Sequence, residues 1–145
     1  MPKQTASKSR SFKSARTHFG TRRAMRFAHA VAGTRAFIAL VFSIAFIVVP
    51  EDMMPGSSAE PARSLALLFV SRNIAFGVAL LVLAVRRIDV PLAWVLIIDV
   101  ALQLYDAAYA HDATAVVPVV IGVLEALAAR QLLSGAALKE KASAA

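Results

Sequence analysis

Four apolar runs of about 20 residues each alternate with short polar segments along most of this chain. A helix of about 20 residues rises roughly 30 Å, which matches the thickness of the hydrocarbon core of a bilayer. The runs are apolar on nearly all sides, whereas each helix of a soluble bundle keeps a polar stripe. The pattern therefore predicts an all-α fold, a four-helix transmembrane bundle. The predicted spans are residues 30–49, 63–85, 91–110 and 115–133.

Polar tails flank the predicted transmembrane domain, which we place at residues 30–134. Residues 1–29 form a basic tail rich in Lys, Arg, Ser and Thr, and residues 135–145 form a polar C-terminal tail. The basic tail has too little apolar surface to fold alone, so we expect it to be disordered as far as about Thr17.

Local signals mark several predicted helix ends. Pro91 suits the first turn of the third span, and Asp112 or Thr114 could cap the start of the fourth. Gly135 is expected to end the fourth helix. Arg35 lies about one and a half turns inside the predicted start of the first span, so we expect its side chain to snorkel to the membrane interface.

The second apolar run, residues 65–85, carries Arg72 near its middle. A charged Arg at the centre of a span costs on the order of 2.5–3.5 kcal/mol on insertion scales, so an acid at similar depth should compensate it. Two acids qualify, Asp99 in the third run and Glu125 in the fourth. Counting residues from the span ends on one side of the membrane places all three side chains near the midplane.

Helical spacing adds further polar residues to this predicted cluster. Asp99, Gln103 and Asp106 are spaced i, i+4 and i+7, so they share one face of the third span. Glu125 shares its face of the fourth span with small residues, which allow close helix approach. Gln103 and its counterpart Asn73 are expected to form hydrogen bonds between helices. The predicted intramembrane cluster comprises Arg72, Asn73, Asp99, Gln103, Asp106 and Glu125.

The predicted cluster allows two interpretations. In the first it is a functional site, where Arg72 binds an anion or where Asp99 or Glu125 carries a proton. In the second it is an ion-pair network that fixes helix register. Two acids then face one base, so one acid, with Glu125 as our choice, would be held protonated.

Basic residues are distributed unevenly along the chain. Residues 1–35 contain nine Lys or Arg and no Asp or Glu, and the loop at Arg86 and Arg87 and the C-terminal tail are also basic. The other two loops have only Arg63 beside them. The positive-inside rule therefore predicts that both termini face the cytoplasm of a multi-pass cell-membrane protein. An organellar inner membrane is the alternative, because an Arg-rich, Ser-rich and acid-free tail also describes a transit peptide.

The basic tail also indicates partners. Besides the bilayer itself, we expect anionic lipid headgroups to bind it, at roughly 1 kcal/mol per basic residue. Nucleic acid is not an expected partner, because clustered base alone is a weak signal for it. A homo-oligomer or a membrane-complex partner is expected, because four spans seldom enclose a pathway alone.

Cysteine is absent, which excludes disulfides, thiolate metal sites, iron–sulfur ligation and thiol nucleophiles. The three histidines are His18, His29 and His111, and none lies deep in an apolar run. The motifs of zinc proteases, serine hydrolases and phosphate-binding loops are missing. We therefore predict no catalytic residue, no metal ligand and no cofactor, and an enzymatic role would need a bound cofactor that the sequence does not indicate.

Four short spans, an Arg followed by a helical Gly in the second span (Arg72 to Gly77) and an Asp late in the third (Asp106) resemble the DoxX-like group of small four-helix membrane proteins. The resemblance covers residues 30–133. It implies a four-helix bundle and a role for Arg72 and Asp106. Named members of the group are associated with quinone-linked sulfur oxidation complexes, and many others have no assigned function.

The leading functional hypothesis is a non-catalytic membrane protein, either an accessory or assembly subunit or a ligand-binding protein. The competing hypothesis is a proton-coupled transporter of small molecules that acts as an oligomer. A wide polar cavity that reaches both surfaces would favour transport. A dry, closed pairing of the central arginine with an acid would favour the structural role.

Overall fold

In the computed structural model, residues 5–53, 55–56, 59–109 and 115–144 are described, and helices are the regular elements that they form. Side chains are described from Arg23 onward, except that of Tyr109. In chain order the helices are α1 (Thr5–Val48), α2 (Pro50–Met53), α3 (Ala62–Arg86), α4 (Asp89–Tyr109) and α5 (Val116–Ser143). The expected caps Asp112 and Thr114, and His111, lie outside the described residues.

Four of these helices are long and apolar enough to cross a membrane. The candidate spans are Arg23–Val48, Ala62–Arg86, Asp89–Ala108 and Val116–Ser143. Large apolar side chains cover their outward faces, and examples are Phe37, Ile44, Leu68 and Val85, each more than half exposed. Such a surface suits lipid and not water, because large apolar patches are rare on soluble monomers. The predicted four-helix transmembrane bundle is confirmed at this level.

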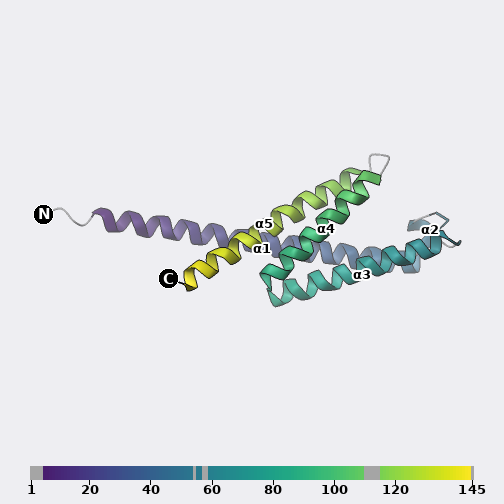
Figure 1. The fold of residues 1–145 in the computed structure, drawn as a ribbon, viewed down its shortest axis with the longest axis horizontal. Helices are drawn as coiled ribbons and strands as arrows, with labels where there is room; N and C mark the ends of the chain where they lie inside the picture. The colour runs from purple at the N-terminus through teal and green to yellow at the C-terminus, as the bar shows by residue number, and fades with distance from the viewer. Residues whose placement is uncertain (1–4, 54, 57–58, 110–114, 145) are drawn as a thin grey trace.

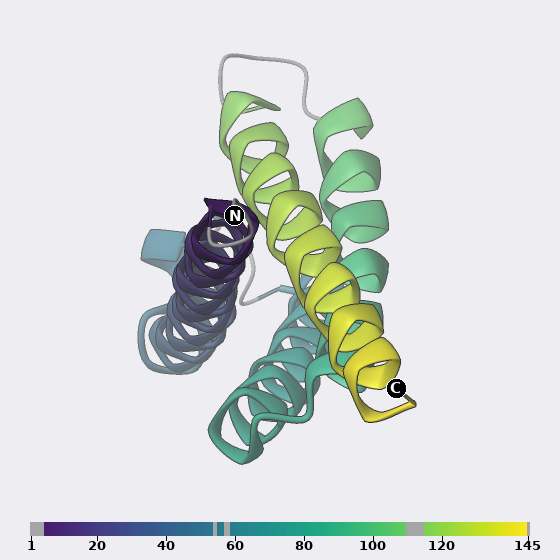
Figure 2. The ribbon, with the colours of Figure 1, turned by 90° about the vertical axis from the view of Figure 1, so that its left-hand side faces the viewer.

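The helices form two antiparallel pairs, α1 with α3 and α4 with α5, which are the two most extensive helix contacts. Figure 1 shows the pairs close together at the α3–α4 turn and spread apart toward their opposite ends. The α1–α5 contact joins the two pairs, and α3 packs less extensively on α4. Viewed along the bundle, α5 lies between α1 and α4 (Figure 2). We call the two ends of the molecule the turn end and the open end.

Small residues on α1 let the other helices approach it closely. Ala28, Ala32, Ala36 and Ala39 are fully or almost fully buried, and they repeat every three or four residues along one helix face. On α3, a Cβ at Gly77 would lie 3.3 Å from the backbone oxygen of Ala36. Packing through small residues is the usual way in which membrane helices associate, because lipid provides no hydrophobic driving force between them.

The α1–α5 contact explains why α5 does not end where we expected. Gly135 lies inside α5, and a Cβ there would come 2.7 Å from Sδ of Met25. The prediction that Gly135 ends this helix is wrong, because the glycine serves close helix packing and strong helix formers such as Ala136, Ala137 and Leu138 continue the helix.

The first helix also begins earlier than expected. We predicted that the first span starts at residue 30 and that the tail is disordered as far as about Thr17, but α1 is helical from Thr5. Its candidate membrane span begins at Arg23. Because the candidate span starts earlier, Arg35 lies deeper in it than we expected. It moves from near the predicted span end to the middle of the span.

Candidate functional site at the centre of the bundle

Arg35 is the cation at the centre of the bundle. It lies in the middle of the Arg23–Val48 span, and Asp99 lies in the middle of α4. Nε of Arg35 donates a 3.0 Å hydrogen bond to Oε1 of Glu125, and its Nη2 donates a 3.3 Å hydrogen bond to Oδ1 of Asp99. One guanidinium therefore connects three helices, α1, α4 and α5, at mid-depth. We call Arg35, Asp99 and Glu125 the central cluster.

The central cluster is closed to its surroundings. The exposed fractions of the side chains are 10% for Arg35, 3% for Asp99 and 1% for Glu125. Charges in so dry a site interact strongly, and each would be very costly if left unpaired. Burial and pairing together make this cluster the main polar connection between the two helix pairs.

The central cluster contains more acid than base. Oδ2 of Asp99 lies 2.9 Å from Nε of Arg35, yet it accepts no hydrogen bond, because the single Nε–H points to Oε1 of Glu125. Oε2 of Glu125 is also buried without a hydrogen-bond partner among the described residues. Two carboxyl groups thus face one guanidinium, and one of them could hold a proton at one of these two oxygens.

The prediction that Arg72 is the cation of this cluster is wrong, as is the prediction that Arg35 snorkels to the interface. Both errors come from the predicted start of the first span, which placed Arg35 close to a membrane surface. Asp99 and Glu125 do lie together at mid-depth, as predicted. A sequence signal for Arg35 exists, because it shares the buried face of α1 with Ala28, Ala32 and Ala39.

Arg72 pairs instead with Asp106. Nη2 of Arg72 donates a 3.2 Å hydrogen bond to Oδ2 of Asp106, which connects α3 to α4 toward the open end. The guanidinium also lies over the ring of Phe69, 5.2 Å from its centre, in a cation–π contact. The Phe69 ring in turn lies 5.7 Å from that of Phe46 on α1. About one third of each charged side chain remains exposed, 33% for Arg72 and 37% for Asp106.

The two predicted amide residues are both buried, with different surroundings. Nδ2 of Asn73 donates to the backbone oxygen of Phe69 on its own helix, so this hydrogen bond does not join two helices as expected. Gln103 lies on the α4 face that meets α5, where a Cβ at Gly122 would touch it at 3.5 Å. Four of the six predicted residues therefore fall into two separate sites, Asp99 and Glu125 in the central cluster and Arg72 with Asp106 in the second pair, and the two amides belong to neither.

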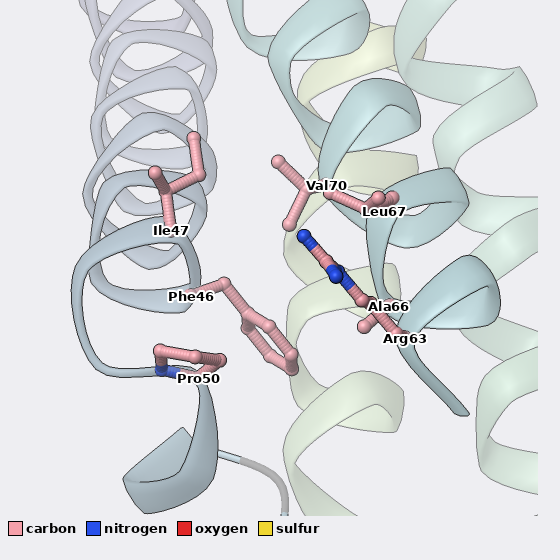
Figure 3. Close-up of a pocket in the computed structure, with 7 residues that line it drawn as sticks. All are labelled: Phe46, Ile47, Pro50, Arg63, Ala66, Leu67 and Val70. Atoms are coloured by element: carbon pink, nitrogen blue, oxygen red, sulfur yellow. The ribbon is translucent and has the colours of Figure 1, made fainter. Parts of the chain in front are cut away.

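One pocket lies beside the central cluster, and another lies near the open end. One, of about 300 Å³, lies between α1 and α5 beside Arg35 and Glu125 and is otherwise lined mainly by apolar side chains. The other, of about 390 Å³, lies between α1 and α3 near the open end, where Figure 3 shows Arg63 reaching along α3 and Phe46 facing it from α1. Each is an apolar hollow with few charges, so neither forms a polar passage through the bundle.

Among the described residues, no three His, Asp or Glu side chains are grouped closely enough to hold a metal ion. Comparison with family models, curated proteins and solved structures found no match to this chain. The two ion-pair sites are therefore the observations from which a function can be argued.

Proposed function

We propose that this chain is a multi-pass protein of the cell membrane, with both termini in the cytoplasm, which acts as a non-catalytic accessory or assembly protein. It associates in the bilayer, with a second copy or with a partner chain, through the surface around Arg72 and Asp106. Membership of the DoxX-like group is part of this proposal, and the pairing of Arg72 with Asp106 supports it.

The partly exposed Arg72–Asp106 pair is the observation that carries the proposal. The two side chains lie in apolar helices, and one third of their surface is uncovered in the single chain. Ionised groups that contact lipid are costly and normally face protein or a water-filled cavity. Phe69 covers one face of the guanidinium only. A second chain that covers the pair would remove this cost, so the surface favours assembly.

The closed central cluster supports a structural role over transport. A transport pathway needs a polar route that reaches both surfaces, whereas Arg35, Asp99 and Glu125 fill the middle of the bundle and are almost fully buried. Their ion pairs hold α1, α4 and α5 in register. Such a bundle is a rigid scaffold on which a binding surface can be presented.

Single-cysteine cross-linking tests the proposal cleanly, because the chain has no cysteine of its own. Ser71 is exposed next to Arg72, and Val123 is exposed at a similar depth on α5. Ser71→Cys and Val123→Cys would each be oxidised with iodine in native membranes. We expect the Ser71→Cys protein to form a covalent dimer or a defined larger adduct, and the Val123→Cys control to remain monomeric.

Adding Arg72→Leu and Asp106→Leu to the Ser71→Cys protein makes the test specific. Loss of the cross-linked product would place the ion pair within the interface. A product at twice the chain mass identifies a second copy, and a product of another mass identifies a partner chain. A Ser71→Cys protein that stays monomeric in native membranes would refute the proposal.

One observation favours the competing function, a proton-coupled transporter. The buried Oδ2 of Asp99 and Oε2 of Glu125 have no hydrogen-bond partner among the described residues, so the central cluster has a place for a proton. Purified protein in liposomes, under a potassium-driven membrane potential, should show no proton flux above empty liposomes if the cluster is structural. A flux that Glu125→Gln abolishes would favour transport.

A further inference from the structure

A polar pocket of about 650 Å³ lies at the turn end of the bundle, away from both ion-pair sites. It is bounded by α1, by the turn between α3 and α4, and by α5. Its polar lining is Arg26, His29, Arg87, Asp89 and Lys139. Four of these five side chains are basic residue types, brought together from three separate parts of the chain.

The single acid in this pocket is already engaged. Nζ of Lys139 donates a 2.7 Å hydrogen bond to Oδ2 of Asp89, and Nε2 of His29 lies 3.4 Å from Oδ1 of the same carboxylate. Nδ1 of His29 lies 2.8 Å from the backbone oxygen of Met25. The Asp89 side chain is only 11% exposed, so a buried carboxylate holds the end of a Lys139 side chain that is 70% exposed.

The two arginines of the pocket have no such partner. Within the part of the chain whose side chains are described, no acid lies within ion-pair distance of Arg26 or Arg87, and both arginines are exposed. Counting Arg26, Arg87 and Lys139 against Asp89, the pocket has two positive charges in excess even when His29 is neutral. Such an excess in a concave site attracts an anion.

Arg87 lies at this pocket at the C-terminal end of α3. Arg87 follows α3 with φ 54° and ψ 40°, a left-handed conformation that helix ends usually give to Gly. Its N–H donates to the oxygen of Ala84, and the N–H of Ile88 donates to that of Leu83. A side chain is less favourable than glycine in this conformation, so replacing Arg87 with glycine is expected to favour folding.

We propose that this pocket binds a phosphate group, with Arg26 and Arg87 as its charged donors and Asp89 as the residue that positions Lys139. A guanidinium matches phosphate oxygens with two parallel hydrogen bonds. The pocket lies at a helix-turn end of the spans, where phospholipid headgroups would lie, and Met25 and Val85 add apolar surface to its lining. The phosphate comes from an anionic lipid or from free phosphate.

Ligand-induced stabilisation of the purified full-length protein in neutral detergent tests this site. The unfolding midpoint would be measured with dioctanoyl phosphatidylglycerol, with dioctanoylglycerol, which has the same chains and no phosphate, and with inorganic phosphate against sodium chloride of equal ionic strength. A ligand at 100 times its dissociation constant favours the folded state about 100-fold. We expect phosphatidylglycerol to raise the midpoint and dioctanoylglycerol to leave it unchanged.

Two single variants test whether binding depends on the pocket or only on the total positive charge. Each removes one arginine at the end of α3, and only Arg87 lines the pocket. Arg87→Gly suits the left-handed conformation, so it should fold at least as well as the wild type and should lose the phosphate-dependent shift. Arg86→Ala removes a charge outside the pocket and should keep it. A shift with phosphatidylglycerol alone identifies a lipid site, and an equal shift with inorganic phosphate identifies a site for either source.

Three results would overturn the inference. The first is the absence of any shift with phosphatidylglycerol and with phosphate beyond that of dioctanoylglycerol and salt. The second is a full shift in folded Arg87→Gly protein. The third is an equal loss of the shift in Arg86→Ala and Arg87→Gly, which would mean that diffuse charge and not the pocket attracts the lipid.

Discussion

Removal of Arg35 should destabilise this protein more than any other single charge removal. In the native structure the side chains of Asp99 and Glu125 are 3% and 1% exposed, and in Arg35→Ala they would face each other in the interior with no guanidinium between them. Breaking a buried ion pair by removing one partner typically costs about 3–5 kcal/mol, because an uncompensated charge stays in the interior. At 1.4 kcal/mol per tenfold change, this lowers the folding equilibrium constant by roughly two to three and a half powers of ten.

The measurement is reversible unfolding of the purified protein in mixed micelles, followed by circular dichroism. Arg72→Ala is the matched control, because it removes an arginine whose pair is one third exposed and whose loss should cost about 1 kcal/mol or less. Arg35→Ala combined with Asp99→Asn and Glu125→Gln should recover most of the lost stability, because the buried carboxylates are then gone.

Variants that neutralise one acid of the central cluster provide a second comparison. Glu125→Gln and Asp99→Asn each leave one acid facing Arg35, so each should destabilise the protein less than Arg35→Ala does. The reasoning would be refuted if Arg35→Ala were as stable as Arg72→Ala, or if neutralising both acids failed to restore stability to the Arg35→Ala protein.

Two further predictions concern other contacts between the helices. Gly77→Val should lower the free energy of unfolding by about 1–3 kcal/mol in the same assay. A Cβ at this position would already lie 3.1 Å from Cγ of Leu40 and 3.3 Å from the backbone oxygen of Ala36. Gly33→Val is the control, because a Cβ there would meet open space. A double-mutant cycle of Arg72→Leu and Asp106→Leu should give a coupling energy of about 1 kcal/mol in detergent. A coupling near zero would mean that the pair does not connect α3 to α4.

Hydropathy alone was enough to predict the number of spans and most of their ends. The predicted second span, residues 63–85, differs from α3 by one residue at each end, because both ends are set by charged or turn-forming residues close to the apolar run. Counting depth along the spans also identified Asp99 and Glu125 as neighbours. The ends of a span and the depth of a residue within it are properties of a single helix, so they can be predicted from the sequence.

Contacts between helices were harder to predict, because they depend on how the helices cross. We predicted that both acids face Arg72 because all three residues lie at similar depth in their spans, yet equal depth does not decide which helix faces which. Ala28, Ala32 and Ala39 mark the buried face of α1, and Arg35 lies on that face. The pattern of small residues was thus a better guide to the interior than the distance of Arg35 from the predicted span end.

The positions of the two ion pairs follow from the divergence of the two helix pairs. Where α1 and α5 pack through alanine and glycine, the helices are close enough for one guanidinium to contact acids from two other helices, and the site is dry. Toward the open end α3 and α4 spread apart, as Figure 1 shows, and the long Arg72 side chain connects to Asp106 without enclosing it. An ion-pair site is therefore closed at the centre, whereas nearer the open end about one third of each charged side chain remains exposed. A partner that completes the second pair must approach at the open end, opposite the pocket that we assign to phosphate, so the two proposed interactions can occur together on one molecule.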